Sequence, residues 1–208
     1  MLGNRGKLIS VFRIIAKIRG LSIITGLLVG LPAYHHPVHA SDDAIRPERV
    51  LSVVTADWNN DGAFDRALLI ASETEPDEVD LLVYLSESSQ SMRLAVSKKN
   101  IAWRGRMWGT QPALETTERG SLVITSANEA IGRNRWSRKL TVVYRDKAFV
   151  VAGYTYTERD TLEPGSPSSC DINFLTGSGV KNKKPFRTLA KAVALTEWSE
   201  ASIPQECR

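Results

Sequence analysis

The chain has 208 residues, with 27 lysines and arginines against 23 aspartates and glutamates, and a formal net charge of +4. Five of the basic residues and none of the acidic ones lie in residues 1–40, so residues 41–208 hold 22 basic against 23 acidic side chains, a net charge of about −1. A domain this close to neutral excludes the nucleic-acid-binding classes that need a strongly basic surface.

Residues 1–40 predict a signal peptide that is removed during export. A basic, acid-free start precedes the apolar stretch 21–33, and residues 38–40 end in the small residue that a cleavage site requires. The apolar stretch is shorter than the ~20 residues that span a bilayer and contains Pro32, which disfavours a retained anchor. A mitochondrial presequence is the weaker alternative. We therefore predict cleavage after Ala40, a periplasmic or secreted protein, and no stable membrane insertion after cleavage.

The histidines bear on catalysis, because all three lie in the segment that is predicted to be removed: His35, His36 and His39. Without them the exported domain has no Ser-His-Asp or Cys-His nucleophilic site and no histidine-ligated zinc. Paired carboxylates or a Ser-Lys pair remain, yet Glu115, Glu118 and Asp160 stand at no spacing that singles out an acid and a base. The sequence predicts a protein that is not an enzyme.

Short runs rich in β-branched and aromatic residues, bounded by turn residues, predict the strands of residues 41–208. No amphipathic helix separates them, which indicates a mainly β, antiparallel domain, either a sandwich or a curved sheet. Asp146-Lys147 is predicted as a hairpin turn and the basic stretch 181–184 as a solvated turn. The predicted strands are residues 50–56, 67–71, 79–85, 94–103, 121–126, 139–145, 148–157 and 172–175.

The stretch 57–65 places oxygen-bearing side chains at loop positions 1, 3, 5 and 9, with Gly62 at position 6. Ca²⁺ takes about six to eight oxygen ligands, and this spacing matches a calcium loop that turns sharply at the glycine. Position 12 is Leu68 instead of the glutamate of an EF-hand. An Asx-rich turn without metal is the alternative, although its carboxylates would repel one another. We predict a structural Ca²⁺ site whose ligands are Asp57, Asn59, Asp61, the Ala63 carbonyl and Asp65.

The C-terminal region holds two further predictions. Cys170 and Cys207 are the only cysteines, and in an exported chain they are expected to form a disulfide that ties down the tail; two free thiols are the alternative. Residues 191–198 fit a final strand. However, four residues recur at the spacing of one helical face and favour a short helix: Leu189, Ala192, Val193 and Thr196.

Two segments are candidates for binding a partner. The run 133–139 combines basic residues with one tryptophan, which suits an acidic protein or an anionic glycan; the alternative is a charged edge strand that prevents aggregation. The run from Trp103 to Trp108 is either an exposed aromatic loop or a pair of tryptophans that cover the core. The candidate partner-binding residues are Arg133, Arg135, Trp136 and Arg138.

The strand, loop and strand around residues 57–65 resemble the calcium loop of FG-GAP and VCBS-type repeats. Those repeats usually follow one another as the blades of a β-propeller, but the motif Asp-x-Asn-x-Asp-Gly occurs once in this chain. A propeller needs about four or more blades, so the resemblance implies the loop and its Ca²⁺ ion without the propeller.

A looser resemblance covers residues 50–177. The single Asp/Asn loop, the segment 142–156 and the segment 170–177 are similar in their order to small periplasmic bacterial proteins, some of which inhibit lysozyme-like cell-wall hydrolases. The resemblance implies a mostly β periplasmic domain with one Ca²⁺ site. We expect an exported, calcium-binding, non-catalytic protein of the cell envelope that inhibits a lysozyme-like hydrolase; the alternative is a structural or glycan-binding envelope module.

Overall fold

The computed structural model describes residues 45–208 with the exception of 89–90 and 166, and the predicted signal peptide lies outside these residues. The described residues form one compact unit. Its described residues are mostly strands, as predicted, together with the single-turn 3₁₀ helices Pro47–Arg49, Glu200–Ser202 and Gln205–Cys207. No helix within the described ranges is both long enough and apolar enough to cross a membrane.

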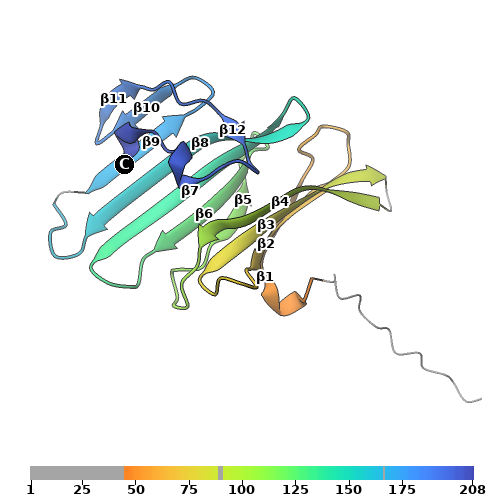
Figure 1. Ribbon diagram of the computed structural model, residues 1–208, viewed down its shortest axis with the longest axis horizontal. Helices are drawn as coiled ribbons and strands as arrows, with labels where there is room; N and C mark the ends of the chain where they lie inside the picture. The colour runs from red at the N-terminus through yellow and green to blue at the C-terminus, as the bar shows by residue number, and fades with distance from the viewer. Residues whose placement is uncertain (1–44, 89–90, 166) are drawn as a thin grey trace, which may run out of the picture. The chain divides into compact units, whose positions relative to one another are not determined.

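The strands form two antiparallel sheets, which confirms the predicted fold class (Figure 1). The first sheet has its strands in chain order: β1 (Val50–Ala56), β2 (Asp65–Ala71), β3 (Glu78–Ser88) and β4 (Ser91–Trp103). The second sheet has the order β11-β10-β9-β8-β7-β6-β5, and β12 also pairs with β8. Its strands are β5 (Ala113–Thr116), β6 (Leu122–Asn128), β7 (Asn134–Arg145), β8 (Ala148–Asp160), β9 (Ser168–Asn173), β10 (Ser178–Lys181), β11 (Lys184–Arg187) and β12 (Val193–Ala194).

Two-residue turns set the register of two hairpins in the second sheet. Asp146 and Lys147 both have positive φ, 52° and 64°, and connect β7 to β8. Asn182 and Lys183, at φ 49° and 67°, connect β10 to β11 in the same way. Paired positive φ values are typical of the hairpin turns whose twist matches that of the strands, and Asp and Asn tolerate them well. Both predicted turns are therefore confirmed.

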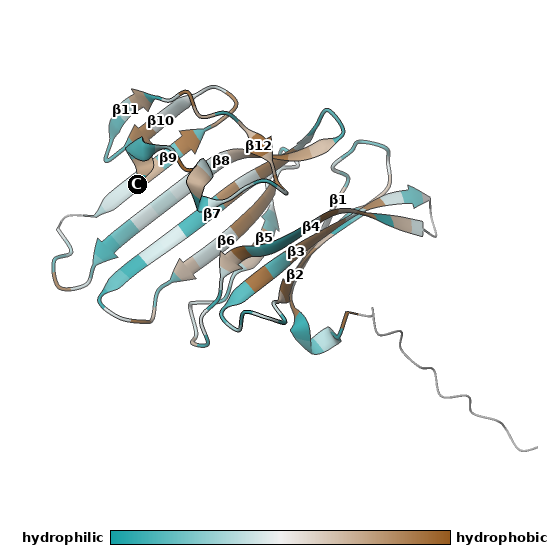
Figure 2. Ribbon diagram, in the orientation of Figure 1, coloured by the Kyte–Doolittle hydropathy of each residue, from teal (hydrophilic) through white to brown (hydrophobic). Residues whose placement is uncertain are grey.

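The two sheets pack face to face around one core. Because alternate residues of a strand point to the same face, Leu122 of β6 and Leu140 of β7 are buried in the same core as Leu69 and Leu81 of the first sheet. Strands β1 and β4 lie beside β5 and β6, so the first sheet covers the second mainly on that side. Figure 2 shows that β7 and β8 are more hydrophobic at the end where a turn joins them and more hydrophilic at the opposite end.

The predicted C-terminal helix is wrong. Residues 193–194 form β12, which pairs with Val150 and Val151 of β8, and the Leu195 N–H then bonds to the Phe149 carbonyl. The strand alternative was closer, because a free stretch of β8 beside its bulge offers backbone partners that a helix would leave unused. The apolar spacing is still satisfied, since Leu195 and Trp198 are buried. Strands β5, β10 and β11 were not predicted.

Candidate functional site

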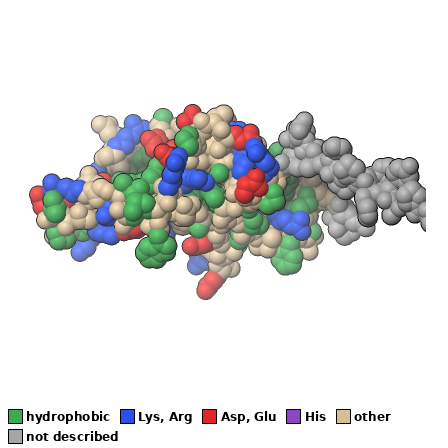
Figure 3. All heavy atoms as spheres, turned by 90° about the horizontal axis from the view of Figure 1, so that it is seen from below, with side chains coloured by type: hydrophobic (Ala, Val, Ile, Leu, Met, Phe, Trp, Pro, Cys, Tyr) green, Lys and Arg blue, Asp and Glu red, His purple; other side chains and the backbone are tan. Residues whose placement is uncertain are grey.

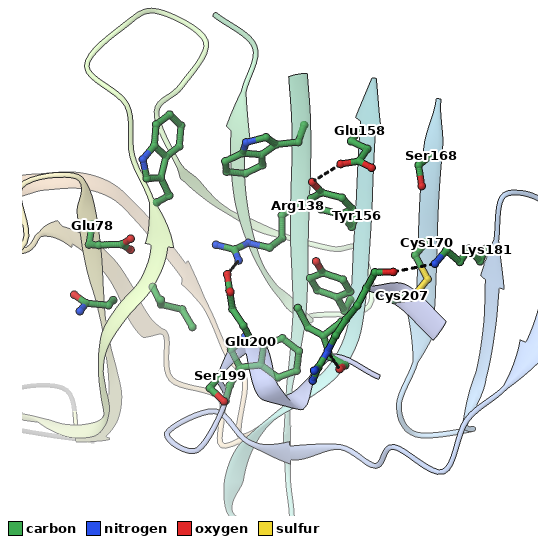
Figure 4. A pocket seen from close by; sticks show the side chains of 18 of the residues that line it. Glu78, Arg138, Tyr156, Glu158, Ser168, Cys170, Lys181, Ser199, Glu200 and Cys207 are labelled. Atoms are coloured by element: carbon green, nitrogen blue, oxygen red, sulfur yellow. Dashed lines mark hydrogen bonds and ion pairs between the residues drawn. A yellow bond between two sulfur atoms is a disulfide. The ribbon is translucent and has the colours of Figure 1, made fainter. Parts of the chain in front are cut away.

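A groove of about 920 Å³ opens on the inner face of the second sheet (Figure 4). Residues of β7 and β8 form its floor. One wall is the end of β4 with the loop between β2 and β3, and the opposite wall is the C-terminal segment 198–208. A concave site of this volume is within the range of sites that hold small molecules.

Five aromatic side chains line the floor and walls of the groove. The rings of Trp103, from β4, and Trp136, from β7, lie 5.4 Å apart at a tilt of 57°. Tyr154 and Tyr156 are stacked on β8, and Trp198 of the C-terminal segment lies 6.0 Å from Tyr154. Trp103, Trp136 and Tyr156 are only partly buried, so their rings remain accessible from the groove.

Charged groups are interleaved with these rings. The Arg138 guanidinium lies 6.0 Å from the centre of the Trp136 ring, and one of its nitrogens lies 3.3 Å from a carboxylate oxygen of Glu200. Across the groove, burial raises the pKa of Glu78, an effect that the nearby Arg138 charge opposes. The Tyr156 hydroxyl donates a 3.0 Å hydrogen bond to Glu158. Burial and that bond raise the pKa of Tyr156 to about 12.

The disulfide between Cys170 and Cys207 is confirmed, and it holds the C-terminal wall against β9. Both cysteines line the groove, and their Cα atoms are 5.6 Å apart. Lys181 Nζ donates to the Arg208 carbonyl and ties the same wall to β10. A cross-link that closes a loop over a sequence separation of 37 stabilises the fold by about 4 kcal/mol in the chain-entropy model.

The structure divides the predicted basic cluster. Trp136 and Arg138 are two positions apart on β7, so both point into the groove. Arg133 instead lies in the preceding loop and pairs with Asp160 and Glu163, while Arg135 donates to the Gly132 carbonyl. The edge-strand alternative is wrong, because β7 pairs with both β6 and β8. Figure 3 shows the same mixture of signs, with blue and red side chains interspersed on the visible face.

The segment from Trp103 to Trp108 is also divided. Trp103 lines the groove, whereas the Trp108 side chain is 96% exposed on the loop between β4 and β5. Neither predicted alternative holds for both tryptophans. The carboxylates Glu115 and Glu118 lie outside the groove, and Asp160 is held by Arg133, which lowers its pKa through a hydrogen bond.

The predicted calcium loop joins β1 to β2, and its side chains bond to its own backbone. Asp57 accepts hydrogen bonds from the N–H groups of Asp61 and Gly62, and Asp61 accepts one from Ala63. Asp65 is fully buried and accepts from the N–H groups of Trp58 and Ser86. As these side chains are placed, no three acidic, histidine or cysteine residues of the described part of the chain form a group that could hold a metal ion.

Sequence reasoning missed the groove residues Glu78, Trp198 and Glu200. They come from β3 and from the tail, more than a hundred residues apart in the chain, and no local motif connects them. The sequence did single out the basic and aromatic pair on β7, Trp136 and Arg138, and Trp103 of the run 103–108. No protein-family model matches this chain, and no curated protein and no solved structure matches it significantly.

Proposed function

We propose that this protein is an exported, non-catalytic binding protein of the cell envelope, stabilised by Ca²⁺, whose groove holds a saccharide. The observation that carries the proposal is the groove itself, in which charged groups are interleaved with five aromatic rings. These rings belong to Trp103, Trp136, Tyr154, Tyr156 and Trp198. Of the two functions expected from the sequence, this geometry supports the glycan-binding module better than the hydrolase inhibitor.

A saccharide fits the chemistry of the groove because a sugar ring has an apolar C–H face and a polar hydroxyl edge. Indole and phenol rings offer large flat surfaces to the C–H face. Arg138, Asn100 and Ser199 offer hydrogen-bonding groups to the hydroxyl edge from the floor and both walls. A purely apolar ligand would leave these polar groups without partners, which is costly in a desolvated site.

Catalysis is not part of the proposal. Glycoside hydrolysis needs an acid and a second carboxylate that is held ready on the other side of the scissile bond. Glu78 and Glu200 do line one groove, but Glu200 is 85% exposed and bound to Arg138, which suits a movable side chain more than a fixed nucleophile. Release of reducing sugar from any bound oligosaccharide would contradict this part of the proposal.

The experiment is a titration of the protein with soluble oligosaccharides, followed by tryptophan fluorescence and calorimetry. Trp136→Ala is expected to lower affinity by about tenfold or more, because alanine removes the aromatic surface at the groove floor. Trp108→Ala is the matched control, since Trp108 is exposed outside the groove and its loss leaves affinity unchanged. Equal effects of the two substitutions would place the binding surface elsewhere.

Inhibition of a lysozyme-like hydrolase stays a prediction and is measured on the same variants. Stoichiometric inhibition that survives Trp136→Ala, together with no oligosaccharide binding by the wild type, would replace the saccharide proposal by the inhibitor one. Retention on envelope glycan that needs Trp136 supports the saccharide proposal.

The Ca²⁺ part of the proposal rests on a contrast between two buried aspartates. Asp80 is buried and has Lys99 Nζ at 2.8 Å from its carboxylate, whereas no described lysine or arginine forms an ion pair with the fully buried Asp65. A buried carboxylate is costly without a counter-charge. A Ca²⁺ ion in the loop would supply that charge, and the oxygens of Asp57 and Asp61 each keep a lone pair for it after their backbone bonds.

Thermal melting with increasing Ca²⁺ tests this site. At ten times the Kd, bound Ca²⁺ stabilises the wild type by about 1.4 kcal/mol, and Asp61→Ala is expected to abolish the shift. Glu118→Ala, in the exposed turn between β5 and β6, is the control and keeps it. Identical melting curves with and without several millimolar Ca²⁺ would reduce the loop to an Asx-rich turn.

A further inference from the structure

Arg138 has an unusual environment for the floor of a groove. Its side chain is only 17% exposed, yet its ion-pair partner Glu200 is 85% exposed and reaches over from the C-terminal wall (Figure 4). The pair is joined by one contact, from an Nη atom of Arg138 to a carboxylate oxygen of Glu200, at 3.3 Å. A single long bond to an exposed side chain is weak and easily exchanged.

The remaining donors of Arg138 are available for a ligand. A guanidinium carries five N–H donors in one plane, and among the described residues Glu200 is the only acceptor that bonds to it. The Trp136 ring, at 6.0 Å, supports the guanidinium from one side. Arg138 is therefore a partly buried fork of donors at the groove floor, and Glu200 uses only one of these donors.

We propose that Arg138 binds a carboxylate of the ligand in two-point fashion, that the saccharide is consequently an acidic one of the uronic-acid type, and that Glu200 occupies the carboxylate position in the free protein. The inference rests on the proposed saccharide-binding function and names the class of its ligand. Planar carboxylates match the guanidinium fork better than single hydroxyl groups do.

Glu200 itself shows that the groove accommodates a carboxylate at Arg138. When the ligand's carboxylate replaces that of Glu200, the charge beside Arg138 is unchanged, and Glu200 moves into solvent, where it is already mostly exposed. The groove is also lined by the acidic side chains of Glu75, Glu78 and Glu158, of which burial raises the pKa of Glu78 and so favours its neutral form. Lys181 adds a positive charge on the neighbouring wall.

The test compares two probes that differ only at the carboxyl group: oligogalacturonate and its carboxyl-reduced form. Binding of each to the intact protein is measured by calorimetry at moderate ionic strength. The wild type is expected to bind the acidic probe about tenfold more tightly or better, in accordance with the strength of hydrogen bonds between charged groups.

Variants of the two side chains are expected to act in opposite directions. Arg138→Gln lowers affinity for the acidic probe by about tenfold or more and lowers affinity for the reduced probe by a clearly smaller factor. Glu200→Gln raises affinity for the acidic probe by about two- to fivefold, because it removes a weak competitor. Arg138→Lys keeps the charge but loses the fork, so it is expected to fall between wild type and Arg138→Gln.

Arg93→Gln and Glu87→Gln are matched controls, since this pair also has one Arg–Glu hydrogen bond but lies outside the groove. Melting curves of all variants establish that they are folded, and Arg138→Lys carries the test if Arg138→Gln does not fold. Equal binding of the two probes, or lower affinity of Glu200→Gln for the acidic one, would overturn the inference and leave saccharide binding standing. Absence of binding by either probe and by neutral oligosaccharides contradicts the proposed function itself.

Discussion

The inner face of β7 divides into two regions with opposite compositions. Leu140 and Val142, where the first sheet covers it, are aliphatic and completely or almost completely buried. Trp136 and Arg138 point to the same face a few residues earlier, but they lie in the groove and are only partly buried. Strand β8 repeats the change, from Val151 in the core to Tyr156 in the groove.

The difference shows that one regular strand can contribute both to the core and to the groove. Alternation along a strand sets which face a side chain occupies, and the cover above that face sets its solvent exposure. Where a second sheet covers the face, aliphatic side chains give the densest packing. Where the C-terminal segment 198–208 lies over this face in place of the first sheet, aromatic and charged side chains remain accessible from the groove.

The largest expected effect is on the covered half. Leu140→Ala removes a side chain from the packed interface between the sheets and is expected to destabilise the protein by about 2–5 kcal/mol, through lost burial and the cavity that remains. Chemical denaturation measures this loss as a lower midpoint. A loss below about 1 kcal/mol would mean that the sheets do not pack closely over β7.

Removal of the disulfide is expected to have the next largest effect and to act on the groove wall. Cys207→Ser reduces the unfolding free energy by about 2–4 kcal/mol, because the unfolded chain is no longer constrained between residues 170 and 207. The same variant lowers saccharide affinity, since the C-terminal wall loses its covalent link to β9. The wild type in reductant should behave in the same way, and an unchanged affinity would show that the wall needs no cross-link.

On the groove half, Trp136→Ala is expected to cost clearly less stability than Leu140→Ala does, although tryptophan is the larger side chain. The reason is that Trp136 is only partly buried and water can occupy the space that it leaves. Denaturation of the two variants under identical conditions checks the order. A larger loss for Trp136→Ala would mean that the groove half is a second core.

The smallest expected effect is the pH dependence of the unfolding free energy that arises from Tyr156 in the groove. The pKa of Tyr156 is raised to about 12, against about 10 in an unfolded chain, so the neutral phenol is favoured in the folded state. Its contribution to stability is fully present below pH 10 and is lost as pH rises from about 10 to about 12. Because the ring is partly exposed, the loss is at most about 1 kcal/mol.

Ultraviolet difference titration of the wild type against Tyr156→Phe isolates this phenol, and Glu158→Gln is expected to lower its pKa by removing the negative charge that favours the neutral phenol. Ionisation of Tyr156 near pH 10 in the folded protein would show that the groove floor is fully hydrated.

Local sequence signals were sufficient for most strands and for both hairpin turns. The predicted strand 50–56 has the same bounds in the structure, and 148–157 ends three residues early, because the charged residues after Thr157 disguise the end of β8. Strands β5, β10 and β11 have only four residues each and exist by pairing with their neighbours, so alternation is too short to show them. The helix predicted from Leu189, Ala192, Val193 and Thr196 is wrong because backbone bonding to β8 outweighed a weak local preference.

By itself, the sequence determined the β class, the positions of the turns and the disulfide, because each depends on residue types that are close in the chain or on the only available pair of cysteines. Only the tertiary structure decided the groove. Its aromatic and charged side chains come from strands of both sheets and from the C-terminal segment. They become neighbours because the aliphatic halves of β7 and β8 are buried in the core, and this burial fixes the position of the other halves, which form the groove floor.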